Sequence, residues 1–376
     1  MISAPTGPEL KLLENGKLLI CNKALRILPG KRLVYRGLID DIPVIVKLFL
    51  QPGHGKRHCQ REIAGLEALN KHQIPAPELL FRGDFQFQST PEDQPDIKPG
   101  QVVPGVVISY LDAAIDLRSF WHGTAPQQEK NHWLRAALMT VAKQHALGVI
   151  QQDLHLGNFL LANQTIYTID GDGIRTQKKP LTPDQTWHWV GVFFAQIYPR
   201  FDHLFDALLA DYCEARKLSF STLVVTAVKR ARDRQRAKIG DSVRSKIFRN
   251  SGLCIAEKHF FYSFSCARQF DNPEIRVLLA RLARGEEPAK SELDQGILKV
   301  NGIDLQVQKF TGLQHFGWQT SQSRGASCPW QRAHLAVQFG LPANTPVALV
   351  QRKFGPLQWA SYYLSLAGER AQGQGL

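Results

Sequence analysis

The stretch IQQDLHLGNFLL, residues 150–161, places an Asp, a His and an Asn between two apolar runs. Asp153 and Asn158 are five residues apart in it. The segment FLLANQTIYTI (159–169), which overlaps its end, is typical of a hairpin with a short polar turn. Because a hairpin returns the chain to its start, we expect Asp170, directly after it, to lie beside Asn158.

These side chains match the few groups that phosphoryl transfer requires of a protein. A carboxylate must accept the proton of the attacking hydroxyl, and Asp153 is the candidate base. Hard oxygen ligands must hold Mg²⁺ on the phosphates, and Asn158 and Asp170 are the candidates. Asp172, in the sequence IDGDG, is a further candidate ligand.

A cation for the non-transferred phosphates is expected from a strand earlier in the chain. Lys47 is the only basic residue within the apolar run 43–50. A buried lysine must be paired, and Glu62, on a helix expected over 58–72, is the natural partner. Glu67 is the fallback, although it lies on a different face of that helix.

Strand patterns dominate the first part of the chain and helical patterns the second. Residues 32–50 are typical of a hairpin, VVPGVVISYL (102–111) is typical of a buried strand, and residues 184–285 are expected to be mostly helical. This succession predicts an α+β fold. We expect a small sheet-rich lobe over 1–111 and a larger helical lobe over 112–290.

Composition limits the partners and the environment of the chain. It has 376 residues, 44% of them hydrophobic, which is more than one small core needs. The formal net charge of +13 favours anionic partners such as nucleotides, phosphorylated glycans or a membrane surface. The six cysteines lack metal-ligand or redox spacing, so we expect a reduced cytosolic protein without a structural metal. We expect neither a secretory signal nor a membrane-spanning helix.

Basic residues are concentrated in one segment, VTAVKRARDRQRAKIGDSVRSKIFR (225–249). It carries nine Lys or Arg residues and two Asp residues, a net charge of +7. These two acids are too few to pair with the bases along a helix. We therefore expect the segment to contact an anionic partner, and a solvated helix face is the alternative.

Four stretches of the chain resemble the bacterial lipopolysaccharide core kinases, which are the Kdo and heptose kinases of the protein-kinase-like superfamily. They are VIVKLF, REIAGLEALNKHQIPAPELL, KQHALGVIQQDLHLGNFLL and YTIDGDGIR, within residues 30–175. The resemblance implies a bilobal protein-kinase-like fold with ATP and Mg²⁺ as cofactors. It implies Asp153 as the catalytic base and Asn158 and Asp170 as metal ligands.

The same resemblance implies the nucleotide contacts and the reaction. Lys47 would contact the phosphates with Glu62 as its partner, and backbone groups near Ser109 and Leu111 would contact adenine. The implied reaction is phosphorylation of a heptose or Kdo sugar of the lipopolysaccharide inner core. It would take place at the cytoplasmic face of the inner membrane, where the basic segment would contact anionic lipid or the charged acceptor.

The chain departs from regulated protein kinases at several positions. Gln152 replaces the Arg that precedes the catalytic Asp in those enzymes, the metal motif is Asp-Gly-Asp, and no Ala-Pro-Glu follows. The segment expected to cover the phosphates, RLVYRGLIDD (32–41), has a single glycine. His155 is expected either to contact substrate or to bond to its own loop. These features favour a small-molecule or glycan kinase.

A second, degenerate copy of the sheet-rich lobe is expected over residues 291–376. GILKVNGIDLQVQKFTG (296–312) resembles the first hairpin, and residues 323–366 follow the plan of the helix and strand after it, beginning with Ser-Arg. Gln308 stands where the first copy has Lys47. A C-terminal subdomain docked on the first kinase is the alternative.

This second copy is not expected to complete a kinase site. No Asp or Glu occurs between Leu305 and Gly368, so we expect no acidic partner there for Lys309. No second Asp-x-x-x-x-Asn motif follows it. The segment is expected to bind an anion or a partner, or to be part of a longer tandem protein.

Three other functions compete with the glycan kinase. A phosphotransferase of the aminoglycoside or choline type is disfavoured because Gln151 replaces the His that those enzymes carry two residues before the catalytic Asp. A pseudokinase or accessory binding protein of the cell envelope is favoured by the single glycine in the phosphate segment. A nucleic-acid-binding role rests on basic charge alone, and we expect none.

Overall fold

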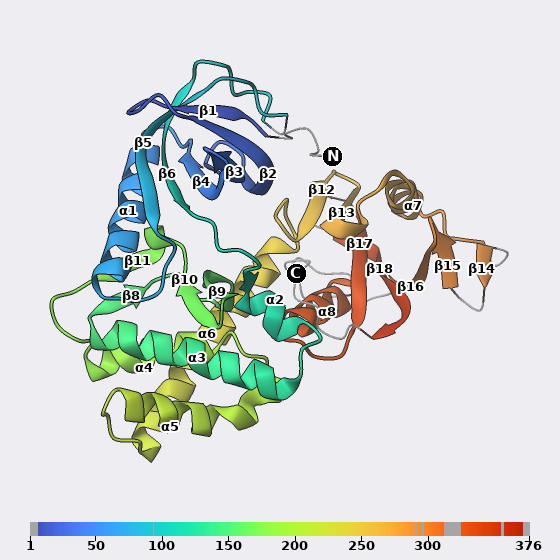
Figure 1. The fold of residues 1–376 in the computed structure, drawn as a ribbon. Coiled ribbons are helices and arrows are strands. Elements are labelled where there is room, and N and C mark those ends of the chain that lie inside the picture. The colour runs from blue at the N-terminus through green and yellow to red at the C-terminus, as the bar shows by residue number, and fades with distance from the viewer. Residues whose placement is uncertain are drawn as a thin grey trace. The chain divides into compact units, whose positions relative to one another are not determined.

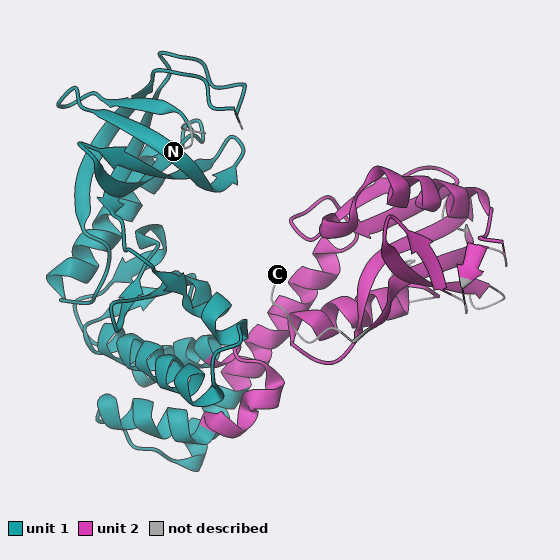
Figure 2. Cartoon of the chain, turned by 45° about the vertical axis from the view of Figure 1, so that its right-hand side comes forward, with its two compact units in different colours: residues 1–193, 206–229 teal, residues 194–205, 230–376 magenta. Residues whose placement is uncertain are grey.

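The computed structural model has a mixed α+β fold and divides into two compact units, shown in Figures 1 and 2. The structure describes residues 7–92, 94–289, 292–294, 297–311, 325–354 and 357–370. Unit 1 comprises residues 1–193 and 206–229, and unit 2 comprises residues 194–205 and 230–376. The boundaries expected after residues 111 and 290 stay predictions, since this division separates the chain only into two units.

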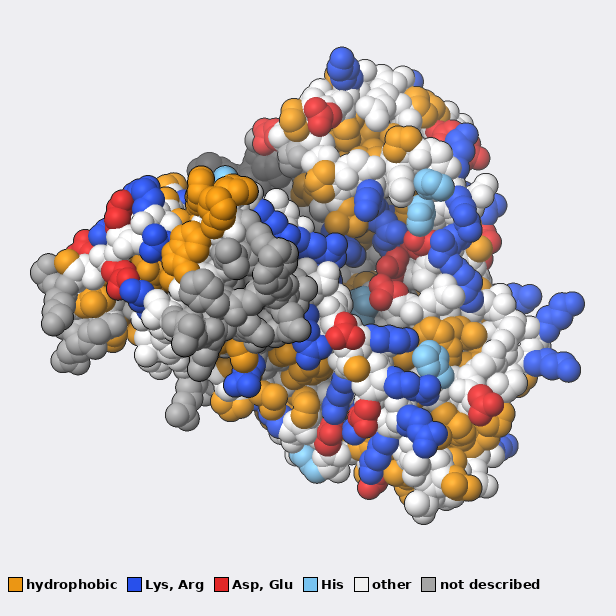
Figure 3. Space-filling model, turned by 180° about the vertical axis from the view of Figure 1, so that it is seen from behind, with side chains coloured by type: hydrophobic (Ala, Val, Ile, Leu, Met, Phe, Trp, Pro, Cys, Tyr) orange, Lys and Arg blue, Asp and Glu red, His pale blue; other side chains and the backbone are white. Residues whose placement is uncertain are grey.

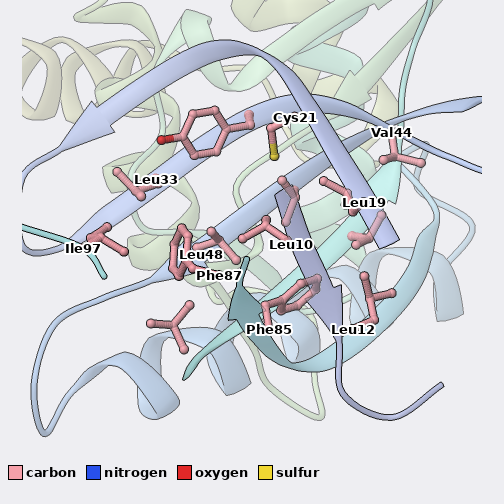
Figure 4. Packing of buried hydrophobic residues seen from close by; sticks show 14 residues of the cluster. Leu10, Leu12, Leu19, Cys21, Leu33, Val44, Leu48, Phe85, Phe87 and Ile97 are labelled. Carbon is pink, nitrogen blue, oxygen red and sulfur yellow. The ribbon is translucent and has the colours of Figure 1, made fainter. Parts of the chain in front are cut away.

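Unit 1 begins with a closed barrel of six antiparallel strands. In order around the barrel they are β1 (Glu9–Leu12), β2 (Leu18–Leu28), β3 (Arg32–Ile39), β4 (Ile42–Phe49), β6 (Val102–Ser109) and β5 (Leu79–Phe87). On β4 every second side chain from Val44 is apolar and buried, namely Val44, Val46 and Leu48. These side chains fill the barrel interior, as Figure 4 shows.

The hairpin predicted over 32–50 is confirmed as β3 and β4. Its turn has two consecutive residues with positive φ, Asp40 at 49° and Asp41 at 63°. Such a turn matches the right-handed twist of the paired strands, and Asp tolerates this conformation better than most residues. Helix α1 (Gly55–Lys71) follows β4 and confirms the helix expected over 58–72.

The rest of unit 1 is mainly helical, with two small sheets. The elements that follow the barrel within unit 1 are β7 (Ile115–Asp116), α2 (Leu117–His122), α3 (Gln127–Ala146), β8 (Val149–Gln151), η1 (Leu156–Asn158), β9 (Phe159–Ala162), β10 (Thr165–Thr168), η2 (Gly171–Gly173) and β11 (Ile174–Thr176). Four further elements reach or lie in unit 2, namely α4 (Pro183–Phe194), η3 (Pro199–Leu204), α5 (Phe205–Ala215) and α6 (Thr222–Lys246). The hairpin predicted over 159–169 is confirmed, because β9 and β10 pair with Thr165 opposite Ala162.

Unit 2 is built on a seven-stranded antiparallel sheet. Its order is β12 (Cys254–Lys258), β13 (Tyr262–Ala267), β17 (Asn344–Phe354), β18 (Leu357–Arg370), β16 (Ile303–Thr311), β15 (Ile297–Val300) and β14 (Leu293–Asp294). Helices α7 (Pro273–Arg284) and α8 (Ser327–Gln338) accompany it. The prediction that 184–285 is mostly helical missed the β12–β13 hairpin. Its strands alternate between apolar and polar residues over only a few positions, and the turn between them is apolar.

Both units contain the same strand order, which supports the expected internal repeat. The order β2-β3-β4-β6-β5-β1 of the barrel corresponds to β14-β15-β16-β18-β17-β13 in unit 2. Helix α1 follows β4 in the chain, and α8 follows β16 after residues outside the described part, which include the expected Ser323 and Arg324. In the described residues β13 and β14 are not paired, and α7 lies between them in the chain, so this sheet is not closed.

One expectation about the second copy was wrong. Lys309 does have an acidic partner, because its Nζ lies 2.5 Å from Oε1 of Glu287. The acid comes from the segment before β14, outside the acid-free stretch between Leu305 and Gly368. The Glu287 side chain also accepts a hydrogen bond from the hydroxyl of Tyr362 on β18.

The basic segment 225–249 is also paired more fully than its own acids allow. Most of it forms α6, and Arg232 and Arg236 both bind Asp202, which lies in η3 far from them in the chain. The Arg232 side chain is only 11% exposed. At least part of the +7 charge therefore holds the fold together. No helix in the described residues has the length and apolarity to span a membrane.

Candidate active site

The barrel and α1 are joined by a buried ion pair. Nζ of Lys47 on β4 lies 2.5 Å from Oε1 of Glu62 on α1, and Glu62 is fully buried. This pairing was predicted and is confirmed. The fallback Glu67 instead binds Arg82 at the surface, at 2.6 Å.

Glu62 also reaches the turn that carries the Asp-Gly-Asp motif. Its Oε2 accepts a hydrogen bond of 2.9 Å from the backbone N–H of Asp172. Helix and turn approach so closely that a Cβ on Gly65 would lie 2.0 Å from the carbonyl oxygen of Gly171. A Cβ on Gly171 would lie 2.3 Å from the carbonyl oxygen of Glu62. Glycine is therefore required on both sides of this contact.

Asp170 has a strained backbone beside this contact. Its φ of 69° and ψ of 72° are in the left-handed region, which costs a residue with a Cβ roughly 1–3 kcal/mol. Such strain is retained where the surrounding structure determines it, and it is concentrated at functional sites. Here the Gly65–Gly171 contact and the preceding β10 strand fix the turn.

The loop between β8 and β9 brings Asp153 to the same turn. β8 pairs with β11, with Gln151 opposite Ile174, and the N–H of Gln152 donates to the carbonyl oxygen of Gly173 at 2.8 Å. Nδ2 of Asn158 donates to the carbonyl oxygen of Asp153 at 2.7 Å, which secures the loop from within.

The residue directly before Asp170 pairs with Asn158, because the N–H of Ile169 donates to the carbonyl oxygen of Asn158 at 3.0 Å.

Three of the predicted carboxylates line one open cleft of about 330 Å³. They are Asp153, Asp170 and Asp172, and the other lining residues include Arg26, Arg32 and Arg61. In Figure 3 acidic side chains lie in a hollow of unit 1 with Lys and Arg side chains around it. The cleft therefore combines carboxylates that can take a proton or a cation with guanidinium groups that can take an anion.

The two carboxylates of the Asp-Gly-Asp motif have different surroundings. Asp172 is held by three basic side chains, with Arg32 at 3.1 Å, His58 at 2.9 Å and Arg61 at 3.0 Å. Asp170 has a weaker contact with one of them, 3.3 Å from Oδ1 to Nη1 of Arg32. Asp172 is thus already compensated by positive charge, whereas Asp170 retains an oxygen for a further ligand.

Asn158 and Asp170 fit a hard divalent cation better than Asp172 does. Because Asn158 donates through Nδ2, its Oδ1 is the atom that can act as a ligand. An amide oxygen and a carboxylate are ligands that Mg²⁺ accepts while it keeps waters and phosphate oxygens as the others. In the part of the chain described, no group of three or more His, Cys, Asp or Glu side chains is arranged to hold a metal ion.

His155 faces the candidate base. Its Nε2 lies 3.5 Å from Oδ2 of Asp153, a side chain of the same loop, and the expected contact with substrate stays a prediction. Hydrogen bonding from His155 is the main cause that lowers the pKa of Asp153 below its ordinary value. Asp153, whose side chain is 69% exposed, is therefore ionised and accessible at neutral pH.

The segment that covers the cleft was predicted wrongly. RLVYRGLIDD (32–41) forms β3 and the turn after it, and only its first residue lines the cleft. The covering element is the β2–β3 hairpin, whose turn contains Gly30 with φ of 66°. Arg26 and Arg32, one on each strand of this hairpin, line the cleft. Basic side chains are therefore present where a glycine-containing segment was expected to cover the phosphates.

A second, basic groove adjoins the cleft. It has a volume of about 460 Å³, and its lining includes Arg57, Arg61 and Arg175 and no acidic residue. Arg61 and Arg175 both donate to the backbone carbonyl of Asp172, at 3.2 and 3.0 Å. Since Arg61 lines both hollows, an anionic group in the groove would lie next to the cleft.

The residues expected at adenine, Ser109 and Leu111, do not line the cleft. Ser109 ends β6, where its N–H donates to the carbonyl oxygen of Glu78 and its Oγ accepts from the N–H of Glu78, both at 2.9 Å. Leu111 follows in the connection to β7. The expected contact of these residues with adenine stays a prediction.

Sequence reasoning missed the basic residues of the site. His58 and Arg61 are spaced with Glu62 on one face of α1, and this periodicity was a usable signal. Arg26 and Arg32 flank a Pro-Gly turn, which indicates a hairpin ahead of the predicted one. The contacts of Arg32 with Asp170 and Asp172 span 138 and 140 positions of the chain and have no local signal.

Compared with protein-family models and with curated proteins, the chain gives no match to any family model and no significant match to a curated sequence.

Proposed function

We propose that this protein is an ATP- and Mg²⁺-dependent phosphotransferase with a bilobal protein-kinase-like architecture in unit 1. The observation that carries the proposal is a connected set of contacts. The Lys47–Glu62 pair joins the barrel to the turn after Asp170, and that turn lies in one cleft with Asp153. Such a set supplies a cation for phosphates, ligands for a metal and a base for the acceptor.

Each residue has a defined task in this proposal. Lys47 neutralises the non-transferred phosphates, and Glu62 fixes its position. Asn158 and Asp170 would hold Mg²⁺, which neutralises charge on the phosphates. Asp153 accepts the proton of the acceptor hydroxyl while that oxygen bonds to the terminal phosphorus and the bond to ADP breaks.

The acceptor in this proposal is anionic. The groove with Arg57, Arg61 and Arg175 would hold a phosphate or carboxylate group of the acceptor near the cleft. A heptose or Kdo sugar of the lipopolysaccharide inner core has this character, and the resemblance of the four stretches favours it. The enzyme would then act at the cytoplasmic face of the inner membrane as a peripheral protein.

The test is ATP turnover by the full chain with core oligosaccharide as acceptor. We expect stimulation by the acceptor and a loss of about 10²–10⁴-fold in Asp153→Asn, the usual contribution of a general base. Asp241→Asn is a matched control, because Asp241 is 74% exposed in unit 2 and outside the cleft. If Asp153→Asn turns over ATP like the wild type, the assignment of the base is wrong.

A pseudokinase that binds a partner is the second candidate. It is favoured by Arg32, which contacts both Asp170 and Asp172 and competes with a metal for the first of them. Calorimetric titration with Mg²⁺–ATP distinguishes the two functions. Binding that is lost in Lys47→Met supports catalysis, whereas no binding at millimolar nucleotide supports the pseudokinase.

A further inference from the structure

The β12–β13 hairpin of unit 2 ends in an unusual turn. The N–H of His259 donates to the carbonyl oxygen of Tyr262 at 2.8 Å, so Phe260 and Phe261 are the two central residues of the turn. These positions normally carry Gly, Asn or Asp, because they face water and because these residues tolerate the backbone conformations of a two-residue turn. Here two aromatic rings are 59% and 60% exposed.

A third phenylalanine joins them from the neighbouring strand. Phe354 ends β17 and is 51% exposed, and the N–H of Lys353 donates to the carbonyl oxygen of Phe261 at 2.8 Å. The ring centroid of Phe354 lies 4.8 Å from that of Phe260 and 5.8 Å from that of Phe261. We call Phe260, Phe261 and Phe354 the Phe tip.

Lysines flank the Phe tip. Lys258 and Lys353 directly precede the turn and Phe354 in the chain. Burial is the main cause that lowers the pKa of Lys353, and repulsion from the charge of Lys258 contributes to it. The nearest acid in the chain, Glu257, faces His259 at 3.4 Å and Arg276 at 3.6 Å. An anion beside the two lysines would relieve their repulsion.

We propose that the Phe tip inserts into the interface of an anionic lipid bilayer while Lys258 and Lys353 contact the lipid headgroups. Aromatic rings beside lysines are the composition of segments that lie at this interface. The two backbone hydrogen bonds of the tip reduce the cost of moving it out of water. The charge of the flanking lysines selects the anionic surface.

This membrane contact is independent of the basic segment 225–249 and of the proposed reaction, because no residue of the Phe tip lines the cleft. ATP turnover on a soluble acceptor should therefore be unchanged when the tip is altered. The contact would instead hold the protein at the surface where a lipid-linked acceptor is found.

Sedimentation of the full chain with vesicles tests the proposal. We expect binding to phosphatidylcholine vesicles that contain phosphatidylglycerol, and at least tenfold weaker binding in the double variant Phe260→Ser, Phe261→Ser. Phe220→Ser is the matched control, because Phe220 is 48% exposed and lies in unit 1. This variant should bind vesicles like the wild type. An unchanged thermal unfolding midpoint would show that the double variant is folded.

A second variant separates insertion from charge. Lys258→Gln with Lys353→Gln should reduce the preference for phosphatidylglycerol and the sensitivity of binding to salt. The proposal is overturned if the wild type binds phosphatidylcholine vesicles neither with nor without phosphatidylglycerol, or if the double Phe variant binds like the wild type. It is also overturned if the wild type self-associates through the tip, which sedimentation velocity would detect as a dimer lost in the double Phe variant.

Discussion

Replacing Glu62 should destabilise the protein by an amount that follows from the burial of the Lys47–Glu62 pair. Glu62 is fully buried and Lys47 is 8% exposed, and their charged atoms lie 2.5 Å apart. In Glu62→Gln the lysine remains buried without a compensating charge. Breaking a buried pair in this way costs about 3–5 kcal/mol, a large part of the stability of an ordinary domain.

The same helix provides the matched control. Glu67 is five residues further along α1 and binds Arg82 at 2.6 Å, but the two side chains are 55% and 60% exposed. Water screens this pair, so Glu67→Gln should cost at most about 1 kcal/mol. The two variants make the same chemical change on one helix and differ in burial.

Hydrogen–deuterium exchange in increasing urea measures the local free energy of opening, without assuming that the two units unfold together. Protection of peptides from α1 and residues 169–174 should fall in Glu62→Gln and remain in Glu67→Gln. Adding Lys47→Met to Glu62→Gln should recover stability, with a coupling of about 1–3 kcal/mol. Equal costs for the two Glu variants, or a coupling of zero, would show that Glu62 does not compensate a buried charge on Lys47.

Three further predictions concern pH and packing. His155→Ala should raise the pKa of Asp153 and move the acid limb of the pH profile of ATP turnover to higher pH; an unchanged limb would show that His155 does not act on the base. Gly65→Ala should lower the free energy of unfolding by several kcal/mol, whereas Gly252→Ala, with nothing within 4 Å of the added Cβ, should be nearly neutral in urea unfolding. Burial lowers the pKa of His145 to about 3, so the neutral form stabilises the fold above its unfolded pKa of 6.5, and this stability is lost as pH falls from 6.5 toward 3. The slope of unfolding free energy against pH in this window should be smaller in His145→Gln by about 1.4 kcal/mol per pH unit, and equal slopes would contradict the assignment.

Local patterns were sufficient for the elements that build the cleft. The hairpin after Asn158 and the helix with Glu62 depend on periodicity and turn residues, and both could be predicted. The Lys47–Glu62 pairing could be predicted because a lysine in an apolar run needs an acid nearby. In each case the decisive residues lie within about 20 positions of one another, where chain connectivity limits the alternatives.

Contacts between distant segments could not be predicted. Asp202 pairs with Arg232 and Arg236 across 30 and 34 positions, and Glu287 pairs with Lys309 on β16, beyond strands β14 and β15. In both places the acid that pairs with the bases lies outside the basic segment. A charge run identifies a basic surface only after the acids that fold against it are known.

Helices α1 and α8 occupy equivalent places in the repeat but bury different side chains. The buried positions of α8, Ser327, Trp330, Ala333 and His334, have the same spacing as Cys59, Glu62, Gly65 and Leu66 on α1. By this spacing Trp330 corresponds to Glu62. It is fully buried, and its Nε1 donates to the carbonyl oxygen of Ile247 at 3.4 Å.

This exchange changes what the second sheet can do. A buried Glu at this position would require a buried cation on the facing strand, and Gln308 stands where the barrel has Lys47. Replacing a buried ion pair with an aromatic core is often neutral or stabilising, because no charge has to leave water. Unit 2 thus retains the strand order of the barrel with Trp330 in place of the ion pair. Uncharged polar side chains are buried beside it, and Nε2 of Gln351 on β17 donates to Oγ of Ser327 on α8 at 3.1 Å.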